Sequence, residues 1–373
     1  MRLFFLSLSV IWGERPMKAW RLLAFVTAAF VLSGVDIFGS SAAERALVRP
    51  GETISSARPN DRSELKGPYV GQKPPGMTPE IFAPGIISMG YFERSVVFSP
   101  RQDELFFELR CLGFTTVLLQ MKQNHGVWSR PEMAFFSGIP EYYDDSPFYA
   151  YDGRSLFFTS RRPLSGGEEL RKDSDIWMIR KENGKWGEPC PAKKTLNSAF
   201  DDDYPTLSRS NKLYFSSNRE GNYDIYVSRF SDNGFTEPRR LEPIISTPSF
   251  EGHPFIAADE SYLIFSSDRP GQLGEGDLYI SFKGKDNEWL EPVNMGDKIN
   301  SPFHDVAPCV SSDGQYMFFS SFRPKPRPAE NKRLTFMEVK ELLDGPGNGR
   351  GDIYWVSAKI IDDLKAKELI KTR

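Results

Sequence analysis

Five acidic residues at corresponding places along the chain are the first candidates for chemistry. Four of them stand three positions before a proline, and the fifth takes the matching place in the most N-terminal copy. These residues are Glu93, Asp144, Asp202, Glu251 and Asp305. Gathered at one mouth of a channel, they would concentrate negative potential and could hold a cation or a basic ligand. Two or three carboxylates in a channel could also hydrolyse a glycosidic bond.

Two histidines fall in the same segments as these acids. His253 and His304, with Glu251 and Asp305, could ligate a metal such as Zn²⁺ or Ca²⁺. The chain has no phosphate loop, no dinucleotide fingerprint and no Gly-x-Ser-x-Gly elbow, so we expect no cofactor. The residues therefore form no convincing catalytic set, and a binding protein is better supported than an enzyme.

The acids recur because the chain contains an internal repeat. Strings such as Tyr214-Phe215-Ser216-Ser217 are followed by Asp-Ile-Tyr elements, and from Phe107 the second Phe recurs after 51, 57, 50 and 54 residues. A period of this length, made of short apolar and aromatic runs, is typical of a propeller blade. We predict an all-β β-propeller over residues 79–360, with five four-stranded blades rather than six.

Parts of the repeat resemble the WD40-like repeats of TolB-type β-propellers. The resemblance rests on Phe-Ser-Ser-Asp-Arg-Pro-Gly at 265–271, on the Asp-Ile-Tyr elements and on the Asp-x-x-Pro starts. It covers about residues 79–360 and implies the propeller fold, whereas propellers serve many functions. The chain departs from TolB in two respects: the first copy lacks Asp-Ile-Tyr, and five blades are counted where TolB has six.

The last copy has no fourth strand of its own. The segment 81–88 precedes the first copy, and its Ile-Ile-Ser string matches the string at 244–246, where the chain leaves one blade for the next. We predict that 81–88 completes the last blade beside Tyr354 and Trp355 and so closes the ring. Closure would remove the exposed sheet edges that invite aggregation.

Recurring arginines give the acids a second interpretation. The second strand of each predicted blade ends in an arginine, which would lie beside the acid that starts the antiparallel first strand and could fork to it. These arginines are Arg162, Arg219, Arg269 and Arg323, with Arg110 the nearest candidate in the first copy. A pairing repeated in every blade favours a structural staple, because an active site breaks symmetry.

The largest departure from the repeat is the insertion 325–350, which should hang over the same mouth. It carries Arg327 and Arg333, and Thr335 with Glu338 fits a capping box at the start of a short helix. A long loop on a rigid scaffold often carries function. The insertion is therefore a lid or partner surface, or else an insertion that only packs down.

The first 43 residues have the pattern of a secretory leader. A basic start at Lys18 and Arg21 is followed by an uncharged apolar run over 22–32 and by small residues at 40–43. The run is shorter than the roughly 20 residues of a membrane span, although an uncleaved anchor is the alternative. We predict a periplasmic or secreted protein, with a flexible spacer over 44–78 and a charged tail over 361–373.

Composition narrows the class of partner. The 373 residues include 47 basic and 50 acidic ones, and this near balance argues against a nucleic-acid partner. Cys111, Cys190 and Cys309 lie too far apart for a disulfide framework, so we expect buried thiols, with one long-range disulfide as the alternative. We predict an exported, non-catalytic module that binds a protein or a cell-envelope component at the channel mouth. A glycan-processing hydrolase and a metal-dependent enzyme or sensor are the alternatives.

Overall fold

The strands of the protein form five antiparallel sheets. The computed structural model describes residues 64–111, 115–164, 169–192, 195–231, 234–326, 328–329 and 331–371. The predicted leader over 1–43 and the spacer residues 44–63 lie outside the described residues. Within the described part, the prediction of an all-β propeller with five four-stranded blades is confirmed.

Each sheet runs from an innermost strand to a short outer one, as follows. Blade 1 contains β2 (Glu93–Phe98), β3 (Glu104–Cys111), β4 (Thr115–Asn124), β5 (Val127–Trp128) and β6 (Glu132–Met133). Blade 2 contains β7 (Asp145–Tyr149), β8 (Ser155–Ser160), β9 (Asp175–Glu182), β10 (Lys185–Trp186) and β11 (Cys190–Pro191). Blade 3 contains β12 (Asp202–Leu207), β13 (Lys212–Ser217), β14 (Asp224–Ser231), β15 (Gly234–Phe235) and β16 (Arg239–Arg240). Blade 4 contains β17 (Glu251–Ile256), β18 (Tyr262–Ser267), β19 (Asp277–Phe282) and β20 (Val293–Asn294). Blade 5 contains β21 (Asp305–Val310), β22 (Tyr316–Ser321), β23 (Asp352–Ser357) and β1 (Glu80–Ile81). In the first three blades the outer position is shared by two short strands, which both pair with the third strand.

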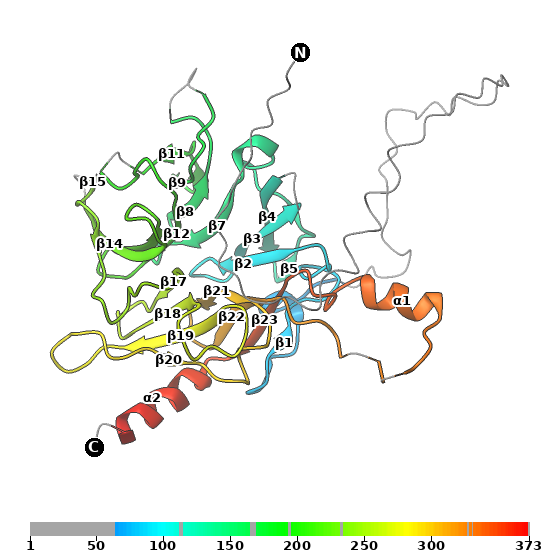
Figure 1. Cartoon of the computed structure of the whole chain (residues 1–373). Coiled ribbons are helices and arrows are strands. Elements are labelled where there is room, and N and C mark those ends of the chain that lie inside the picture. Colours follow the sequence, from blue (N-terminus) through cyan, green and yellow to red (C-terminus); the bar gives the residue numbers. More distant parts are fainter. Residues whose placement is uncertain are drawn as a thin grey trace, which may run out of the picture. The chain divides into compact units, whose positions relative to one another are not determined.

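The innermost strands surround the propeller axis. Each of β2, β7, β12 and β17 contacts the next innermost strand in chain order, and β21 contacts β2, so the five sheets form a ring (Figure 1). All five innermost strands start at or next to a repeat acid, which puts these acids at one end of the ring. We call this end the acid mouth.

The core consists of aromatic side chains packed within and between blades. The second-strand residues Phe107, Phe158, Phe215 and Phe265 are fully buried, and Phe319 is 1% exposed. Burying a side chain of this size contributes roughly 1.5–3 kcal/mol. The outer aromatics Trp128, Phe235 and Trp289 are buried too, as expected for residues that pack between blades.

β1 is the outermost strand of blade 5, although it precedes blade 1 in the chain. Glu80 lies opposite Trp355 and Ile81 opposite Tyr354 in an antiparallel pair, and the Phe82 N–H donates to the Ile353 carbonyl at 2.8 Å. The strand is shorter than the segment 81–88 that the sequence indicates. Pro84 and Gly85 turn the chain, and the Ile87 N–H bonds back to the Ala83 carbonyl at 2.9 Å.

Residues next to the propeller pack against it at both ends of the described chain. Tyr69 and Val70, in a short 3₁₀ turn (Pro68–Gly71) within the range expected to be a spacer, are buried, and the Tyr69 hydroxyl donates to Asp313 at 2.8 Å. The segment expected to be a charged tail forms α2 (Lys359–Lys371), which buries Ile360, Ile361 and Leu364. No helix of the described part is long and apolar enough to cross a bilayer.

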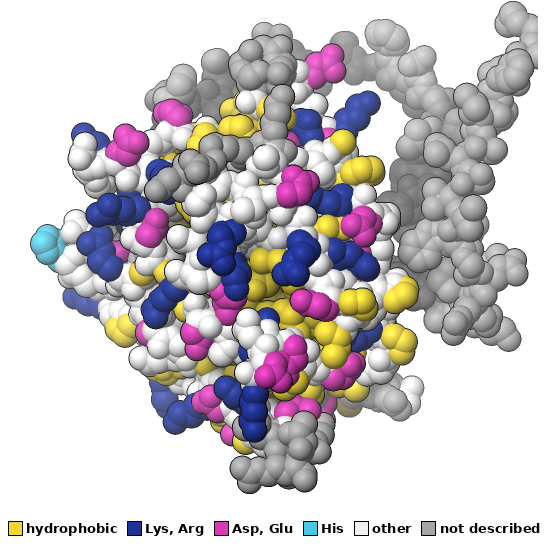
Figure 2. All heavy atoms as spheres, turned by 90° about the vertical axis from the view of Figure 1, so that its left-hand side faces the viewer, with side chains coloured by type: hydrophobic (Ala, Val, Ile, Leu, Met, Phe, Trp, Pro, Cys, Tyr) yellow, Lys and Arg dark blue, Asp and Glu magenta, His cyan; other side chains and the backbone are white. Residues whose placement is uncertain are grey.

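The surface carries charges of both signs. On the side shown in Figure 2, Lys and Arg side chains are interspersed with Asp and Glu. Cys111, Cys190 and Cys309 are free thiols. The expectation of burial is wrong for Cys111 and Cys190, because they lie at a strand end and on an outer edge strand, where both are exposed.

Candidate functional site at the acid mouth

Four of the five repeat acids bond to the arginines that end the neighbouring second strands. All four carboxylates are almost completely buried. The Arg–carboxylate distances are 2.6 Å for Arg162–Asp144, 2.5 Å for Arg219–Asp202, 3.2 Å for Arg269–Glu251 and 2.9 Å for Arg323–Asp305. We call each of these pairs a staple, because it joins the start of the first strand to the end of the second.

A serine and at least two aromatic rings complete each staple. In blade 4 the Arg269 Nε donates to the Ser267 hydroxyl at 3.1 Å, and that hydroxyl donates to Glu251 at 3.0 Å. The Arg269 guanidinium also lies 5.0 Å from the ring centre of Phe265 and 5.2 Å from that of Tyr279. The second serine of the Phe-Ser-Ser string is therefore a staple residue. These contacts engage all four carboxylates, as in the second interpretation of the sequence, and leave one oxygen of Asp144 without a hydrogen-bond partner among the described residues.

Blade 1 lacks the staple. Glu93 is fully buried, but Leu109 takes the place of the serine and Cys111 the place of the arginine. Arg110 points elsewhere, with its Nε 3.9 Å from Glu108. One Glu93 oxygen accepts the Tyr91 N–H at 3.2 Å, and the other has no hydrogen-bond partner in the described part of the chain. Burial, with a smaller contribution from the nearby Asp352 carboxylate, raises the pKa of Glu93 to about 7.

Every innermost strand contains a β-bulge just after its acid. In each bulge two residues oppose one on the second strand, and the first of the two has a positive φ of 50° to 53°. These residues are Ser95, Ser146, Tyr204, His253 and Ala307. Non-glycine residues rarely adopt such φ values, and conformations of this kind cost of order 1–3 kcal/mol. The first serine of the Phe-Ser-Ser string supports the bulge, since Ser216 accepts the His253 N–H at 3.0 Å across the blade boundary.

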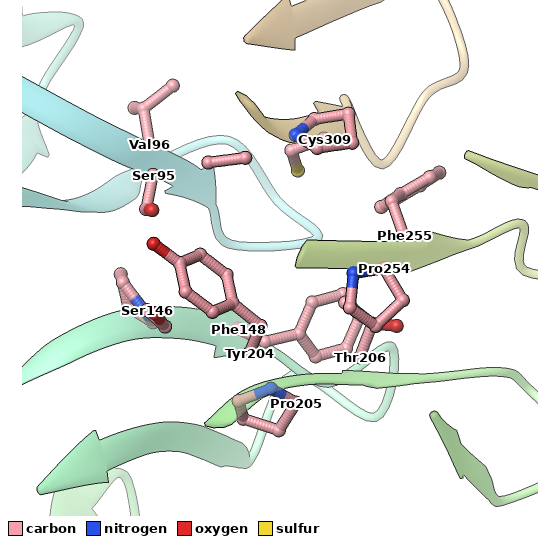
Figure 3. A pocket seen from close by; sticks show the side chains of 13 residues that line it. Ser95, Val96, Ser146, Phe148, Tyr204, Pro205, Thr206, Pro254, Phe255 and Cys309 are labelled. Atoms are coloured by element: carbon pink, nitrogen blue, oxygen red, sulfur yellow. The ribbon is translucent and has the colours of Figure 1, made fainter. Parts of the chain in front are cut away.

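The bulge residues meet around the channel. In Figure 3 the side chains of Ser95 and Tyr204 point toward one another from opposite strands, with Ser146 beside them. Proline rings and Phe255 line the channel beyond, so little open space continues through the ring. A ligand would therefore bind at the mouth rather than within the channel.

A polar cavity of about 340 Å³ opens at the acid mouth above these bulges. Its lining includes Arg94, Asp145, Asp203, Tyr204 and His253, from four innermost strands. Arg94 donates to the Tyr204 hydroxyl and lies 3.4 Å from the His253 Nε2. The Tyr204 and His253 rings are 4.1 Å apart at their centres.

Several buried polar atoms at this cavity have no hydrogen-bond partner within the described residues. They are Arg94 Nε, Asp145 Oδ1, Asp203 Oδ1 and His253 Nδ1. Leaving such an atom unpaired costs about 1–3 kcal/mol, so native proteins seldom do so without a reason. Their convergence on one cavity marks it as the candidate site.

Burial also shifts the protonation of these groups. Burial and the neighbouring Glu108 raise the pKa of Asp145 to about 7, against an opposing effect of Arg110. Burial and the Asp145 carboxylate raise the pKa of Asp203 well above its ordinary value. Burial and the Arg94 guanidinium lower the pKa of His253, which makes its imidazole neutral at pH 7. The site thus holds carboxyl groups that can donate as well as accept protons.

The remaining predicted site residues lie apart from this cavity. His304 faces Glu275 at 3.3 Å, while Glu251 and Asp305 are held in staples. Among the described residues, no three His, Cys, Asp or Glu side chains are placed to hold a metal ion. The metal set expected from His253 and His304 is therefore not assembled.

The insertion forms the short helix that the sequence predicts. α1 (Phe336–Leu343) begins with a capping box between Thr335 and Glu338, and none of its residues is buried. Arg333 is exposed, whereas Arg327 lies outside the described residues. The Asn348 amide fastens the end of the insertion to blade 1 by donating to the Gly90 carbonyl at 2.7 Å.

Sequence reasoning missed Arg94, Asp145, Asp203 and Tyr204. A usable signal lies directly after the repeat acid, where blades 4 and 5 have Gly252 and Val306 but the first three blades have charged residues. A second signal is Glu108, which stands where the other copies have serine or threonine. Both departures from the repeat point to the same side of the ring.

Comparisons with known proteins found matches among solved structures alone. No protein-family model matches the chain, and no curated protein matches it. Among solved structures, TolB from Acinetobacter baumannii is 13% identical, with a TM-score of 0.43, over 71% of this chain and 57% of that one. A putative TolB from Agrobacterium tumefaciens is 15% identical, with a TM-score of 0.44, over 72% and 90% of the two chains. An endo-arabinase from Bacteroides thetaiotaomicron is 12% identical, with a TM-score of 0.42, over 70% and 100%.

The match to the Acinetobacter protein spans less than two thirds of that protein's length, and the low identities carry no activity over to this chain. With its five blades of four strands, the chain is a β-propeller, and its repeated Asp-Ile-Tyr and Phe-Ser-Ser elements resemble those of TolB-type repeats.

Proposed function

We propose that this propeller is a binding module whose ligand, a protein or a cell-envelope component, docks at the acid mouth. One observation carries the proposal: four residues that line one open cavity, Arg94, Asp145, Asp203 and His253, each have a buried polar atom without a hydrogen-bond partner among the described residues. A ligand that supplied their missing hydrogen bonds would remove the cost of leaving them unpaired.

The rim of the acid mouth supports a macromolecular ligand. Most of the exposed large apolar side chains of the described part lie on loops at this end of the blades. They are Tyr91, Ile139, Leu170, Phe200, Leu273, Phe336, Met337, Val339 and Leu343. Apolar side chains gathered on one face with polar neighbours are typical of interaction surfaces. The rim would bind the body of the ligand, while a polar group of the ligand enters the cavity.

Surface plasmon resonance with isolated envelope fractions and purified envelope proteins tests this proposal. We expect Asp203→Asn and Phe336→Ser to weaken binding, because the first changes the cavity and the second the rim. Asp286→Asn, in the exposed turn between β19 and β20 at the opposite end of blade 4, is the matched control and should bind like the wild type. Cavity and rim variants that bind as the control does would refute the proposal.

Hydrolysis of a glycan is the second candidate. Asp145 and Asp203 lie on neighbouring innermost strands, face one cavity and have raised pKa values, as a general acid requires. Release of reducing sugar from oligosaccharides by the wild type, lost in Asp203→Asn with the fold intact, would establish catalysis and replace the binding interpretation.

We also infer that the protein is exported through its first 43 residues. The basic start, the short apolar run and the small residues at 40–43 support this inference. Mass spectrometry of the protein recovered from the periplasm or medium should show a mature N-terminus near residue 44. Recovery of the uncleaved chain with the membrane would favour the anchor instead.

A further inference from the structure

The charges of the mouth cavity compensate one another. Arg94 lies opposite Glu108 in the register of β2 and β3. Burial alone would lower the pKa of Arg94, but Tyr204, Glu108, Asp145 and Asp203 together raise it. Arg110 lines the same cavity and opposes the rise in the pKa of Asp145. No part of the lining therefore carries charge of one sign only. An ion of either sign would meet a charge of its own sign close by, which would repel it.

The unpaired atoms include both donors and acceptors. Arg94 Nε can only donate, whereas the Asp145 and Asp203 carboxyl groups accept when ionised and donate through one oxygen when protonated. A hydroxyl group both donates and accepts, so it satisfies either kind of atom without bringing a charge. Several hydroxyl groups on one rigid ligand would pair these atoms together.

Aromatic rings supply an apolar wall. Tyr204, Tyr223 and Phe250 line the cavity, and the rings of Tyr223 and Phe250 are 5.6 Å apart at their centres. A ligand whose rim is polar and whose faces carry C–H groups fits such a lining. The volume of about 340 Å³ lies within the range of pockets that hold small ligands, roughly 300–1,000 Å³.

We propose that the group entering the mouth cavity is a neutral sugar ring. This proposal rests on the proposed binding function and names the chemistry of its ligand. The ring is either a free saccharide or the exposed residue of an envelope glycan, and both offer the same hydroxyl groups and C–H faces. The Arg94 guanidinium and the Asp145 and Asp203 carboxyl groups bond to its hydroxyls, while the aromatic wall packs against one face.

Isothermal titration calorimetry with matched sugars tests the proposal. The neutral probes are glucose, galactose, arabinose, N-acetylglucosamine, cellobiose and arabinobiose, and the charged ones are glucuronic acid and glucosamine. We expect at least one neutral probe to bind, about tenfold or more tightly than its charged analogue, because the ion meets an unfavourable charge. Tighter binding of both charged analogues than of glucose, or no binding of any neutral probe, would overturn it.

Variants locate the sugar and check the fold. Asp203→Asn and Tyr204→Phe should each weaken binding of the preferred sugar about tenfold. Thermal unfolding should be unchanged or raised for Asp203→Asn and lowered for Tyr204→Phe, because the second change removes the acceptor of an Arg94 hydrogen bond, whereas Asp286→Asn should leave binding and unfolding unchanged. Equal affinities for all three variants would overturn the placement. Binding to purified envelope polysaccharide, with the free sugar inactive, identifies the glycan as the source, and the reverse result identifies the free saccharide.

The two proposals fail in different ways. If Asp203→Asn abolishes binding to an envelope protein while no sugar or polysaccharide binds, the mouth cavity is a binding site but the sugar assignment is wrong. If cavity variants change neither sugar binding nor envelope binding, the proposed function itself is wrong.

Discussion

Glu93 differs from the four stapled acids because its blade has no arginine to pair with it. Its carboxyl group is protonated in the folded protein up to about pH 7, whereas in the unfolded chain it ionises near pH 4.5. Ionisation therefore costs stability as the pH rises from about 4.5 to 7, and the full cost is present above pH 7.

We expect Glu93→Gln to raise the free energy of unfolding above pH 7 by up to about 3 kcal/mol, because glutamine has no charge to bury. Urea unfolding of both proteins between pH 4 and pH 8.5 checks this. The two curves should coincide at pH 4 and separate as the pH rises. A constant difference at every pH would contradict the role of ionisation.

Breaking a staple should lower the free energy of unfolding, whereas Glu93→Gln raises it. Arg269→Ala removes the only cation bonded to Glu251 among the described contacts and leaves a buried carboxylate behind. We expect a loss of about 3–5 kcal/mol in the free energy of unfolding at pH 7. Arg239→Ala, at an exposed position on β16, is the control and should change it by less than about 0.5 kcal/mol. If Arg269→Ala lowers the free energy of unfolding as little as the control does, the staple is weak.

The staples could be anticipated from the sequence, whereas for the mouth cavity the departures from the repeat indicate only the side of the ring and not the geometry. Acid and arginine meet because antiparallel strands bring fixed repeat positions together, and that follows from register alone. The directions of Tyr204 and His253 depend on the bulge, whose positive φ is not marked by glycine in any of the five blades. A regular strand would have turned these side chains differently, because neighbouring positions alternate between faces.

Among the elements, β1 joins the two ends of the propeller. Phe82 follows this strand directly and is fully buried, with its ring 5.1 Å from those of both Phe318 and Trp355. We expect Phe82→Ala to lower the free energy of unfolding by about 3–5 kcal/mol, through lost burial and the cavity left behind. Phe200→Ala, at a half-exposed site, should have little effect in the same urea titration. If Phe82→Ala lowers the free energy of unfolding as little as Phe200→Ala does, β1 is not anchored by this packing.

The length of β1 shows the limit of pattern matching. The Ile-Ile-Ser string matches its later counterpart in sequence, and Ile87 and the matching Ile245 are both buried. The backbone nevertheless leaves the sheet after Phe82, because Pro84 and Gly85 fold the chain back on itself. The matching string marks the passage between blades rather than the strand.

At the scale of the whole molecule, stability and recognition are carried by different parts. The sheets hold the buried aromatic residues, whereas α1 has no buried residue and presents Phe336, Met337 and Leu343 to solvent. We expect replacement of residues 329–343 by Gly-Ser-Gly to shift the melting temperature by less than about 3 °C. Calorimetry measures this shift, and the same protein should lose binding to its envelope ligand. Unchanged binding would remove the insertion from the docking face.

The repeated bulge has a consequence for how this fold can change over time. Its backbone is the same in all five blades, while its first residue is Ser, Ser, Tyr, His or Ala. Each of these side chains is presented to the mouth by the same bulge backbone, whatever the residue type. Substitutions at these five points, among residues that tolerate a positive φ, would therefore change the lining of the mouth while the strands keep their register.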